Sequence, residues 1–350
     1  MRQIPFQHQP KKKHRLRVFT WHIHGSYLYY LSRANCDFYI PVNRGDMAGY
    51  GGRSGAFPWG SNVFEVDAKD VKRMEFDCVL FQHKEQYFKD QYEIFSPKQL
   101  RLPKIFLEHD PPRSHPTDAL HPVQNRNVLL VHVTDFNRLM WDNGITPTAV
   151  ITHGVFAPKG ISANGTKEKE KGLVMVNNLK SRGRRLGADI FRYVRRRIPL
   201  DLLGMNSEEL GGLGEIPHDR IWEVLPRYRF FFNPIRYTSL GLSACEAMFA
   251  GLPIISFATT EMATVVKDGV TGFARNDPDE LINKMRLLLD DQPLALRLGR
   301  NARNYANERF SIERFAREWE DALWGWTVRQ GSRQRVKEEK VGIKGIERTL

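Results

Sequence analysis

The feature that most constrains this fold is a repeated alternation of short apolar runs with longer amphipathic or turn-rich stretches. Each run has the length of one buried strand, and strands that alternate with helices are typical of parallel, doubly wound sheets. We therefore predict an α/β protein with two such sheets. The expected strands cover 16–21, 36–41, 63–66, 78–82, 104–108, 128–133, 149–152, 172–176, 200–203, 229–233, 254–257 and 272–274. The expected helices cover 27–31, 186–197, 219–225, 261–267, 278–289, 293–308 and 312–326.

A polar stretch rich in glycine and charge separates the two halves of the chain. The length of 350 residues suits two domains of about 150 residues each. The divisions that we expect are a basic tail at 1–15, a first Rossmann-like domain at 16–157, a linker at 158–171, a second Rossmann-like domain at 172–310, a closing helix at 311–327 and a charged tail at 328–350.

The chain is basic, with a formal net charge of +13. This charge leaves three interpretations open: binding to nucleic acid, contact with an anionic membrane surface, or basic tails alone. No helix-turn-helix, zinc or base-stacking motif supports nucleic-acid binding. No apolar run reaches the roughly 18 residues that span a bilayer, and the first residues contain no apolar segment typical of a secretion signal. We expect a cytoplasmic protein whose three cysteines are buried free thiols.

A strand, a turn and a helix follow one another closely between residues 230 and 257. The apolar run 230–234 is followed by a glycine-containing segment that opens a helix, which holds Glu246 and ends before Pro253. The first amides of a helix have no intrahelical partner and lie at its positive end, so they favour an anion. A carboxylate two turns further on suits a ribose better than a phosphate. The predicted ligand-binding residues here are Thr238, Ser239, Leu240, Gly241, Leu242 and Glu246.

This segment resembles the donor-binding motif of retaining GT-B glycosyltransferases of the family 4 type, also called glycosyl transferases group 1. That family usually carries two glutamates separated by seven residues, followed by Ala-Met, Gly and Pro. Glu246 stands at the second glutamate with those residues in register, whereas Thr238 stands at the first. The resemblance implies two Rossmann-like domains facing a cleft, closed by a C-terminal helix. It also implies that Glu246 binds the ribose of a nucleotide-sugar donor.

The segment 174–183 resembles the family's strand and loop in which an arginine and a lysine grip the donor diphosphate. Arg182 matches the lysine, and Asn177 or Asn178 replaces the arginine, while Lys180, Arg184 and Arg185 are further sources of charge. Arginine binds phosphate oxygens in bidentate fashion, so Arg182 suits this task. We predict that Arg182 and Lys180 neutralise the leaving diphosphate and that Asn177 contributes to donor binding.

Two segments of the first half are further candidates for the site. His109 follows the strand at 104–108, and the carboxyl ends of strands line the crevice of open α/β sheets. The family often has a histidine there, close to the donor sugar. The loop after the first strand holds His24, Gly25 and Ser26, which the resemblance places on the acceptor side. The glycine-rich stretch 43–61 is a second candidate for an acceptor loop.

The resemblance implies a glycosyltransferase that moves a sugar from a nucleotide-sugar donor to a saccharide or lipid-linked acceptor. We expect retention of configuration, no metal or other cofactor, and a role in polysaccharide or glycolipid synthesis. No Asp-Xaa-Asp pair stands in a loop that suits a metal. Peripheral contact with the inner membrane face stays open. The alternatives are a non-catalytic nucleotide-sugar-binding protein of the same fold, a sugar-nucleotide epimerase and, from charge alone, a nucleic-acid binder.

Overall fold

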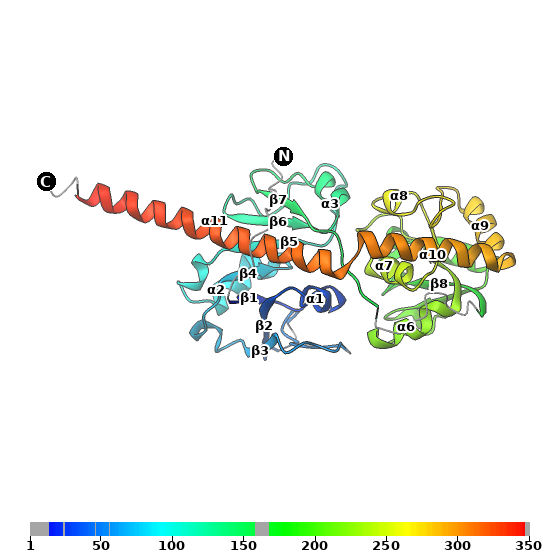
Figure 1. The fold of residues 1–350 in the computed structure, drawn as a ribbon, viewed down its shortest axis with the longest axis horizontal. Helices are drawn as coiled ribbons and strands as arrows, with labels where there is room; N and C mark the ends of the chain where they lie inside the picture. The colour runs from blue at the N-terminus through cyan, green and yellow to red at the C-terminus, as the bar shows by residue number, and fades with distance from the viewer. Residues whose placement is uncertain (1–13, 24, 46, 56, 158–167, 347–350) are drawn as a thin grey trace.

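The computed structural model describes residues 14–23, 25–45, 47–55, 57–157 and 168–346. Two α/β lobes lie side by side, and a long C-terminal helix runs from the second lobe across the first (Figure 1). Each lobe is built around one parallel sheet. The α/β fold class with two parallel sheets, which the alternation of strands and helices predicted, is thereby confirmed.

The first lobe contains a seven-stranded parallel sheet in the order β3-β2-β1-β4-β5-β6-β7. Its strands are β1 Leu16–Thr20, β2 Cys36–Val42, β3 Val63–Asp67, β4 Cys78–Phe81, β5 Lys104–Glu108, β6 Val128–His132 and β7 Thr148–Val150. Its helices are α1 Gly25–Leu31, α2 Gln91–Ile94 and α3 Asp135–Met140.

The second lobe contains a five-stranded parallel sheet in the order β12-β11-β10-β8-β9. Its strands are β8 Lys169–Met175, β9 Leu200–Leu203, β10 Tyr228–Asn233, β11 Ile254–Ser256 and β12 Gly272–Ala274. Its helices are α4 Leu179–Leu186, α5 Ala188–Arg195, α6 Ile221–Val224, α7 Leu242–Phe249, α8 Met262–Val265, α9 Pro278–Asp290 and α10 Gln292–Arg309.

The order of the strands fixes where each sheet offers a crevice. Strand order reverses between β1 and β4 in the first sheet and between β8 and β10 in the second. In open α/β sheets a ligand binds outside the carboxyl ends of the strands at such a reversal. The segments that follow β1, β5, β8 and β10 carry the residues predicted for the site, so the topology directs them towards these crevices.

One predicted helix is divided differently in the structure. A single helix was expected at 186–197, but α4 already begins at Leu179 and α5 follows it after Gly187. Gly187 has a φ of +86°, and a Cβ placed on it would lie 2.0 Å from the carbonyl oxygen of Pro234. Close approach of the backbone after β10 therefore requires glycine here, and the left-handed residue divides the helix.

The C-terminal helix is longer than expected. We predicted a closing helix at 311–327 and a charged tail at 328–350, but α11 runs from Ile312 to Ile346. The stretch after 327 contains no proline and many Lys, Arg, Glu and Gln residues, which are good helix formers. High charge indicated a loose tail, although the same residue types support a solvated helix. Figure 1 shows α11 continuing past the first lobe.

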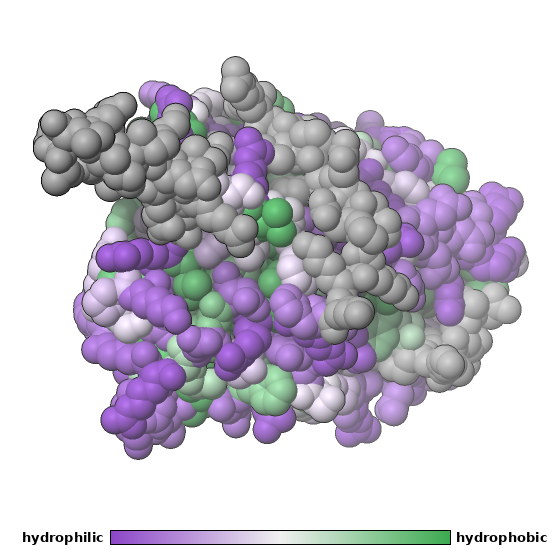
Figure 2. Space-filling model, turned by 60° about the vertical axis from the view of Figure 1, so that its left-hand side comes forward, coloured by the Kyte–Doolittle hydropathy of each residue, from purple (hydrophilic) through white to green (hydrophobic). Residues whose placement is uncertain are grey.

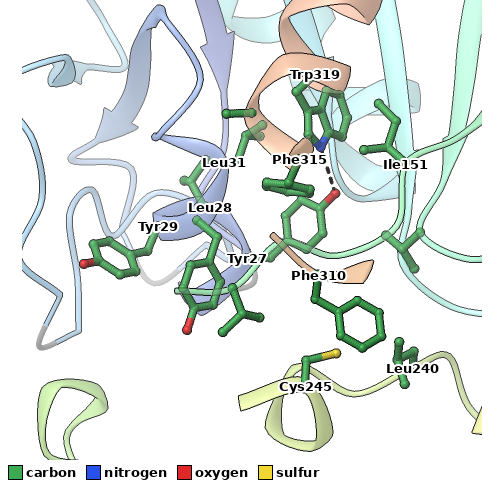
Figure 3. Close-up of a cluster of buried hydrophobic side chains, with 14 of the residues drawn as sticks. Tyr27, Leu28, Tyr29, Leu31, Ile151, Leu240, Cys245, Phe310, Phe315 and Trp319 are labelled. Carbon is green, nitrogen blue, oxygen red and sulfur yellow. Dashed lines mark hydrogen bonds between the residues drawn. The ribbon is translucent and has the colours of Figure 1, made fainter. Parts of the chain in front are cut away.

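The two lobes share a hydrophobic core at their junction. Phe315 and Trp319 of α11 are fully buried against Tyr27 of α1, and the Trp319 indole Nε1 donates a hydrogen bond to the Tyr27 hydroxyl at 3.1 Å (Figure 3). Leu240 and Cys245 of the second lobe belong to the same buried cluster. The closing helix therefore packs against both lobes and fixes how they face each other.

The face of the molecule drawn in Figure 2 is mainly polar where it is coloured. Figure 2 shows a face on which hydrophilic side chains predominate and apolar residues gather in small separate areas. Within the described ranges, no helix combines the length and the apolar character needed to cross a membrane. Cys36, Cys78 and Cys245 are free and buried, as expected from the sequence.

Candidate functional site

A cleft of about 950 Å³ lies between the two lobes, at the carboxyl ends of their strands. Both lobes contribute to its walls, and its volume suits a nucleotide-sized ligand. The structure brings together at this cleft most of the residues predicted for the site. They are His109, Gly25 and Ser26 from the first lobe, and Asn177, Arg182, Thr238, Ser239, Leu240, Gly241, Leu242 and Glu246 from the second.

The turn between β10 and α7 presents a helix N-terminus to the cleft. Gly241 is the N-cap of α7 and supplies no side-chain capping bond. Gly241, Leu242 and Ser243 all line the cleft. The first turn of α7 also contains no acidic side chain that would compete for an anion. The predicted anion-binding segment thus faces the cavity with its positive end.

Glu246 lies further along α7, with 4% of its surface exposed, and it connects the two lobes. Its Oε1 accepts hydrogen bonds from the Tyr30 hydroxyl at 2.9 Å and from His218 Nε2 at 3.0 Å. Burial and the neighbouring Glu246 carboxylate raise the pKa of Tyr30 well above its usual value, so the tyrosine remains a donor. Oε2 has no hydrogen-bond partner in the described part of the chain. One carboxylate oxygen thus anchors the residue while the other remains available.

Sequence reasoning missed both partners of Glu246. Tyr30 lies in α1, whose run of aromatic and aliphatic residues indicated only a buried helix. His218 lies in the short 3-10 turn His218–Arg220, outside any recognised motif. Its ring also packs against Phe57 and Tyr30. Pairing across 216 positions of sequence leaves no local signal, so only the tertiary structure could reveal this contact.

Arg182 is an exposed cation on α4 that lines the cleft. It forms no ion pair with any carboxylate that the structure describes. Partial burial and the nearby charge of Arg185 lower its pKa, and the carboxylate of Asp110 acts in the opposite direction. An arginine stays protonated under these conditions, so Arg182 offers an uncompensated positive charge. Arg113 lines the same cleft from the first lobe and was not predicted from the sequence.

Lys180 was predicted to act beside Arg182, but it does not line the cleft. It is not among the lining residues, and its Nζ lies 3.8 Å from Glu209 Oε2 on the surface. Successive helical residues are rotated by about 100°, so Lys180 and Arg182 point to nearly opposite sides of α4. Asn177 does line the cleft, but its Oδ1 accepts a hydrogen bond from the Met205 amide at 3.0 Å. This bond ties the loop after β8 to the loop after β9.

Three residues were predicted for the acceptor side, and two of them are found at the cleft. Gly25 and Ser26 line the cleft, whereas His24 lies outside the described residues. A Cβ on Gly25 would lie 2.9 Å from Cε2 of Phe57, so the glycine lets this ring approach α1. Phe57 and its neighbour Ser54 also line the cleft. The glycine-rich stretch 43–61 therefore contributes directly to this wall.

Two histidines border the cleft with different environments. His109 Nε2 lies 3.2 Å from Gln82 Oε1, and its ring meets Tyr27 edge to face. His153 is buried, and its Nε2 donates a hydrogen bond to the carbonyl of Leu240 at 2.7 Å. Burial lowers the pKa of His153 to about 4, so it is neutral near pH 7. His153 thus fixes the backbone of the segment 238–242, for which donor binding is predicted, through its bond to Leu240.

In the ranges that the structure describes, no group of three or more His, Cys, Asp or Glu residues could hold a metal ion.

Comparison with known sequences identifies the second lobe. Residues 205–305 match the family described as glycosyl transferases group 1. The trehalose synthases of Thermococcus litoralis and Pyrococcus furiosus are each 31% identical over 83 residues, which is 24% of this chain and 20% of theirs. An uncharacterized glycosyltransferase from Methanocaldococcus jannaschii is 27% identical over 111 residues, 31% of each chain. The matches thus span between a fifth and a third of these relatives.

Solved structures resemble the whole arrangement of the two lobes. Sucrose-phosphate synthase from Thermosynechococcus elongatus has a TM-score of 0.61 at 14% identity, covering 93% of this chain and 100% of that one. HepE from Anabaena, in complex with UDP and glucose, has a TM-score of 0.61 at 13% identity, covering 89% and 100%. The chain therefore has the GT-B glycosyltransferase fold, and residues 205–305 of its second lobe match the glycosyl transferases group 1 family, in agreement with the sequence resemblance.

Proposed function

We propose that this chain transfers a sugar from a nucleotide-sugar donor to a saccharide or lipid-linked acceptor, with the donor held by the second lobe. The observation that carries the proposal is the joint presence of Arg182, the α7 N-terminus and Glu246 at one cleft. Cation and helix amides suit a diphosphate, and the available carboxylate oxygen of Glu246 suits a ribose hydroxyl. The family match of residues 205–305 supports the same assignment.

In the proposed reaction the bond between the sugar C1 and the diphosphate oxygen breaks while C1 forms a bond to the oxygen of an acceptor hydroxyl, and the proton of that hydroxyl passes to the leaving diphosphate. Negative charge then develops on the leaving diphosphate. Arg182 and the amides of Gly241 and Leu242 stabilise this charge, which is the main electrostatic task of the site. His109 lies at the opposite wall, where it hydrogen-bonds a hydroxyl of the donor sugar. We propose retention of configuration, with no metal needed because protein groups supply the charge.

Thr238 lines the cleft at the position where the resembling family has a glutamate. Its hydroxyl can donate and accept a hydrogen bond, but it carries no charge. We propose that Thr238 contacts the donor sugar and that this change alters which sugar is preferred. The acceptor then enters from the side of Gly25, Ser26 and Phe57.

The test compares two cations that are two residues apart on α4. Purified protein is titrated calorimetrically with UDP, GDP, ADP and dTDP, and then with the corresponding sugar nucleotides. Loss of a charge-assisted hydrogen bond costs about 1.5–3 kcal/mol, so Arg182→Ala should weaken the tightest ligand by roughly ten- to a hundredfold. Lys180→Ala is the matched control, and its affinity should equal that of wild type because Lys180 lies outside the cleft.

Glu246→Gln tests the ribose contact, because it keeps the shape and removes the charge. It should weaken the same ligand by about tenfold. Transfer is measured by incubating donor with candidate saccharides and lipid-linked saccharides, with and without EDTA, and EDTA should leave the rate unchanged. The donor assignment is wrong if no nucleoside diphosphate binds, or if Arg182→Ala and Lys180→Ala bind it equally well.

A further inference from the structure

Hydrogen bonds hold the loop after β5 in place and restrict the position of Arg113. The amide of Asp110 donates a hydrogen bond to Glu108 Oε1 at 2.9 Å, and the Trp141 indole donates to the carbonyl of Asp110 at 2.9 Å. The guanidinium of Arg113 binds Asp110 Oδ2. Since Asp110 is held by its own backbone contacts, it restricts where the Arg113 side chain can point.

The same loop is joined to the donor segment of the other lobe. The hydroxyl of Tyr237 donates a hydrogen bond to the carbonyl of Pro112 at 3.0 Å and approaches that of Pro116 at 3.4 Å. Tyr237 directly precedes Thr238, the first residue of the donor segment. Arg113 therefore directly follows Pro112, whose carbonyl is hydrogen-bonded to Tyr237 at the start of the predicted donor segment.

Arginines of both lobes gather near Asp110. Arg113 and Arg182 line the cleft from opposite lobes, and the charges of Arg113, Arg185 and Asp110 all influence the pKa of Arg182. The three guanidinium groups outnumber the Asp110 carboxylate, so this cluster favours an anionic group such as a diphosphate.

We propose that Arg113 is a further donor-binding residue, which contacts the diphosphate from the first lobe while Arg182 contacts it from the second. Tyr237 acts as a positioning residue that keeps the Arg113 loop against the donor segment. A guanidinium has five N–H donors in a fixed fork, so Arg113 can bind Asp110 and a phosphate oxygen at once. This inference rests on the proposed function, since it needs a nucleoside diphosphate in the cleft.

The experiment separates a phosphate contact from a structural effect by varying the number of phosphates on the ligand. UDP, GDP, ADP and dTDP are titrated into the wild-type protein, and the tightest is compared with its own nucleoside in every variant. Arg113→Ala should weaken the diphosphate by about tenfold or more and leave the nucleoside unchanged within about twofold. Arg113→Lys should lie between Arg113→Ala and wild type, because it keeps the charge but not the fork.

Arg73→Ala is the matched control. Arg73 forms the same i,i+3 pair with Asp70 that Arg113 forms with Asp110, but it lies on the surface away from the cleft. It should bind both ligands as wild type does. Tyr237→Phe removes only the hydroxyl, and it should weaken the diphosphate by about threefold to tenfold with the nucleoside unaffected.

The outcomes distinguish the inference from the proposed function. If the wild-type protein binds no nucleoside diphosphate, both are overturned. If it binds one, and Arg182→Ala weakens it while Arg113→Ala does not, the inference alone is overturned. An equal loss of nucleoside and diphosphate affinity in Arg113→Ala also overturns it, because a phosphate contact acts only on the diphosphate.

Discussion

Replacing His153 with glutamine should make the fold less sensitive to acid. His153 is completely buried, and its Nε2 donates to the carbonyl of Leu240 at 2.7 Å. Burial lowers its pKa from 6.5 to about 4. Between pH 6.5 and pH 4, His153 is therefore protonated in the unfolded chain but neutral in the folded protein. Stability from this residue is fully present above pH 6.5 and is lost as the pH falls towards 4.

The size of the effect follows from the shift in the pKa. A difference of 2.5 units corresponds to about 3.4 kcal/mol when both states have titrated, of which roughly 2 kcal/mol is lost between pH 7 and pH 5. Glutamine can place an amide N–H near the position of Nε2 and does not titrate in this range. His153→Gln should therefore lose about 2 kcal/mol less than wild type over this interval.

The assay is urea unfolding followed by fluorescence at pH 7 and pH 5, with the free energy of unfolding extrapolated to water. The informative quantity is the difference between variant and wild type at each pH, in which contributions shared by both proteins cancel. A difference between His153→Gln and wild type that is the same at both pH values would refute the reasoning.

Two further predictions concern the junction of the lobes. Gly154→Ala should destabilise the protein by about 1–3 kcal/mol in urea unfolding, because the new Cβ would lie 2.2 Å from Cβ of Phe315. Gly241→Ala, where the nearest atom would be 3.5 Å away, should unfold almost as wild type does, and equal losses in the two variants would contradict this account. Tyr30→Phe should cost about 1–3 kcal/mol in the same assay, because it removes the hydrogen bond that the buried hydroxyl donates to Glu246. A loss below roughly 0.5 kcal/mol would show that the bond contributes little.

Much of the fold could be read from local patterns in the sequence. Each strand of a buried parallel sheet needs a short apolar run, and such runs marked all twelve strands to within a few residues. The helix boundaries were harder to predict. The division at Gly187 depends on the backbone of Pro234, and the extent of α11 depends on residues whose charge alone suggested a tail.

The donor segment could be located from the sequence because a strand, a turn and a helix N-terminus form a local unit. Thr238, Gly241 and Glu246 are close in the chain, so their common position at the cleft follows from the geometry of this unit. Lys180 was predicted at the same site, but it does not line the cleft. Lys180 is two residues from Arg182 in the sequence, but the rotation between helical positions places its side chain on the other side of α4, towards Glu209.

The sequence by itself determined the two parallel sheets, and it located the α7 N-terminus, Arg182 and Glu246, which the structure brings to one cleft. Tertiary structure alone decided which residues face them: Tyr30 and His218 at Glu246, and Arg113 opposite Arg182. Local patterns record the periodicity of a strand or helix, because neighbouring residues share one backbone conformation. Contacts between lobes depend on how α11 and the buried junction hold the sheets together, and no local pattern records that arrangement.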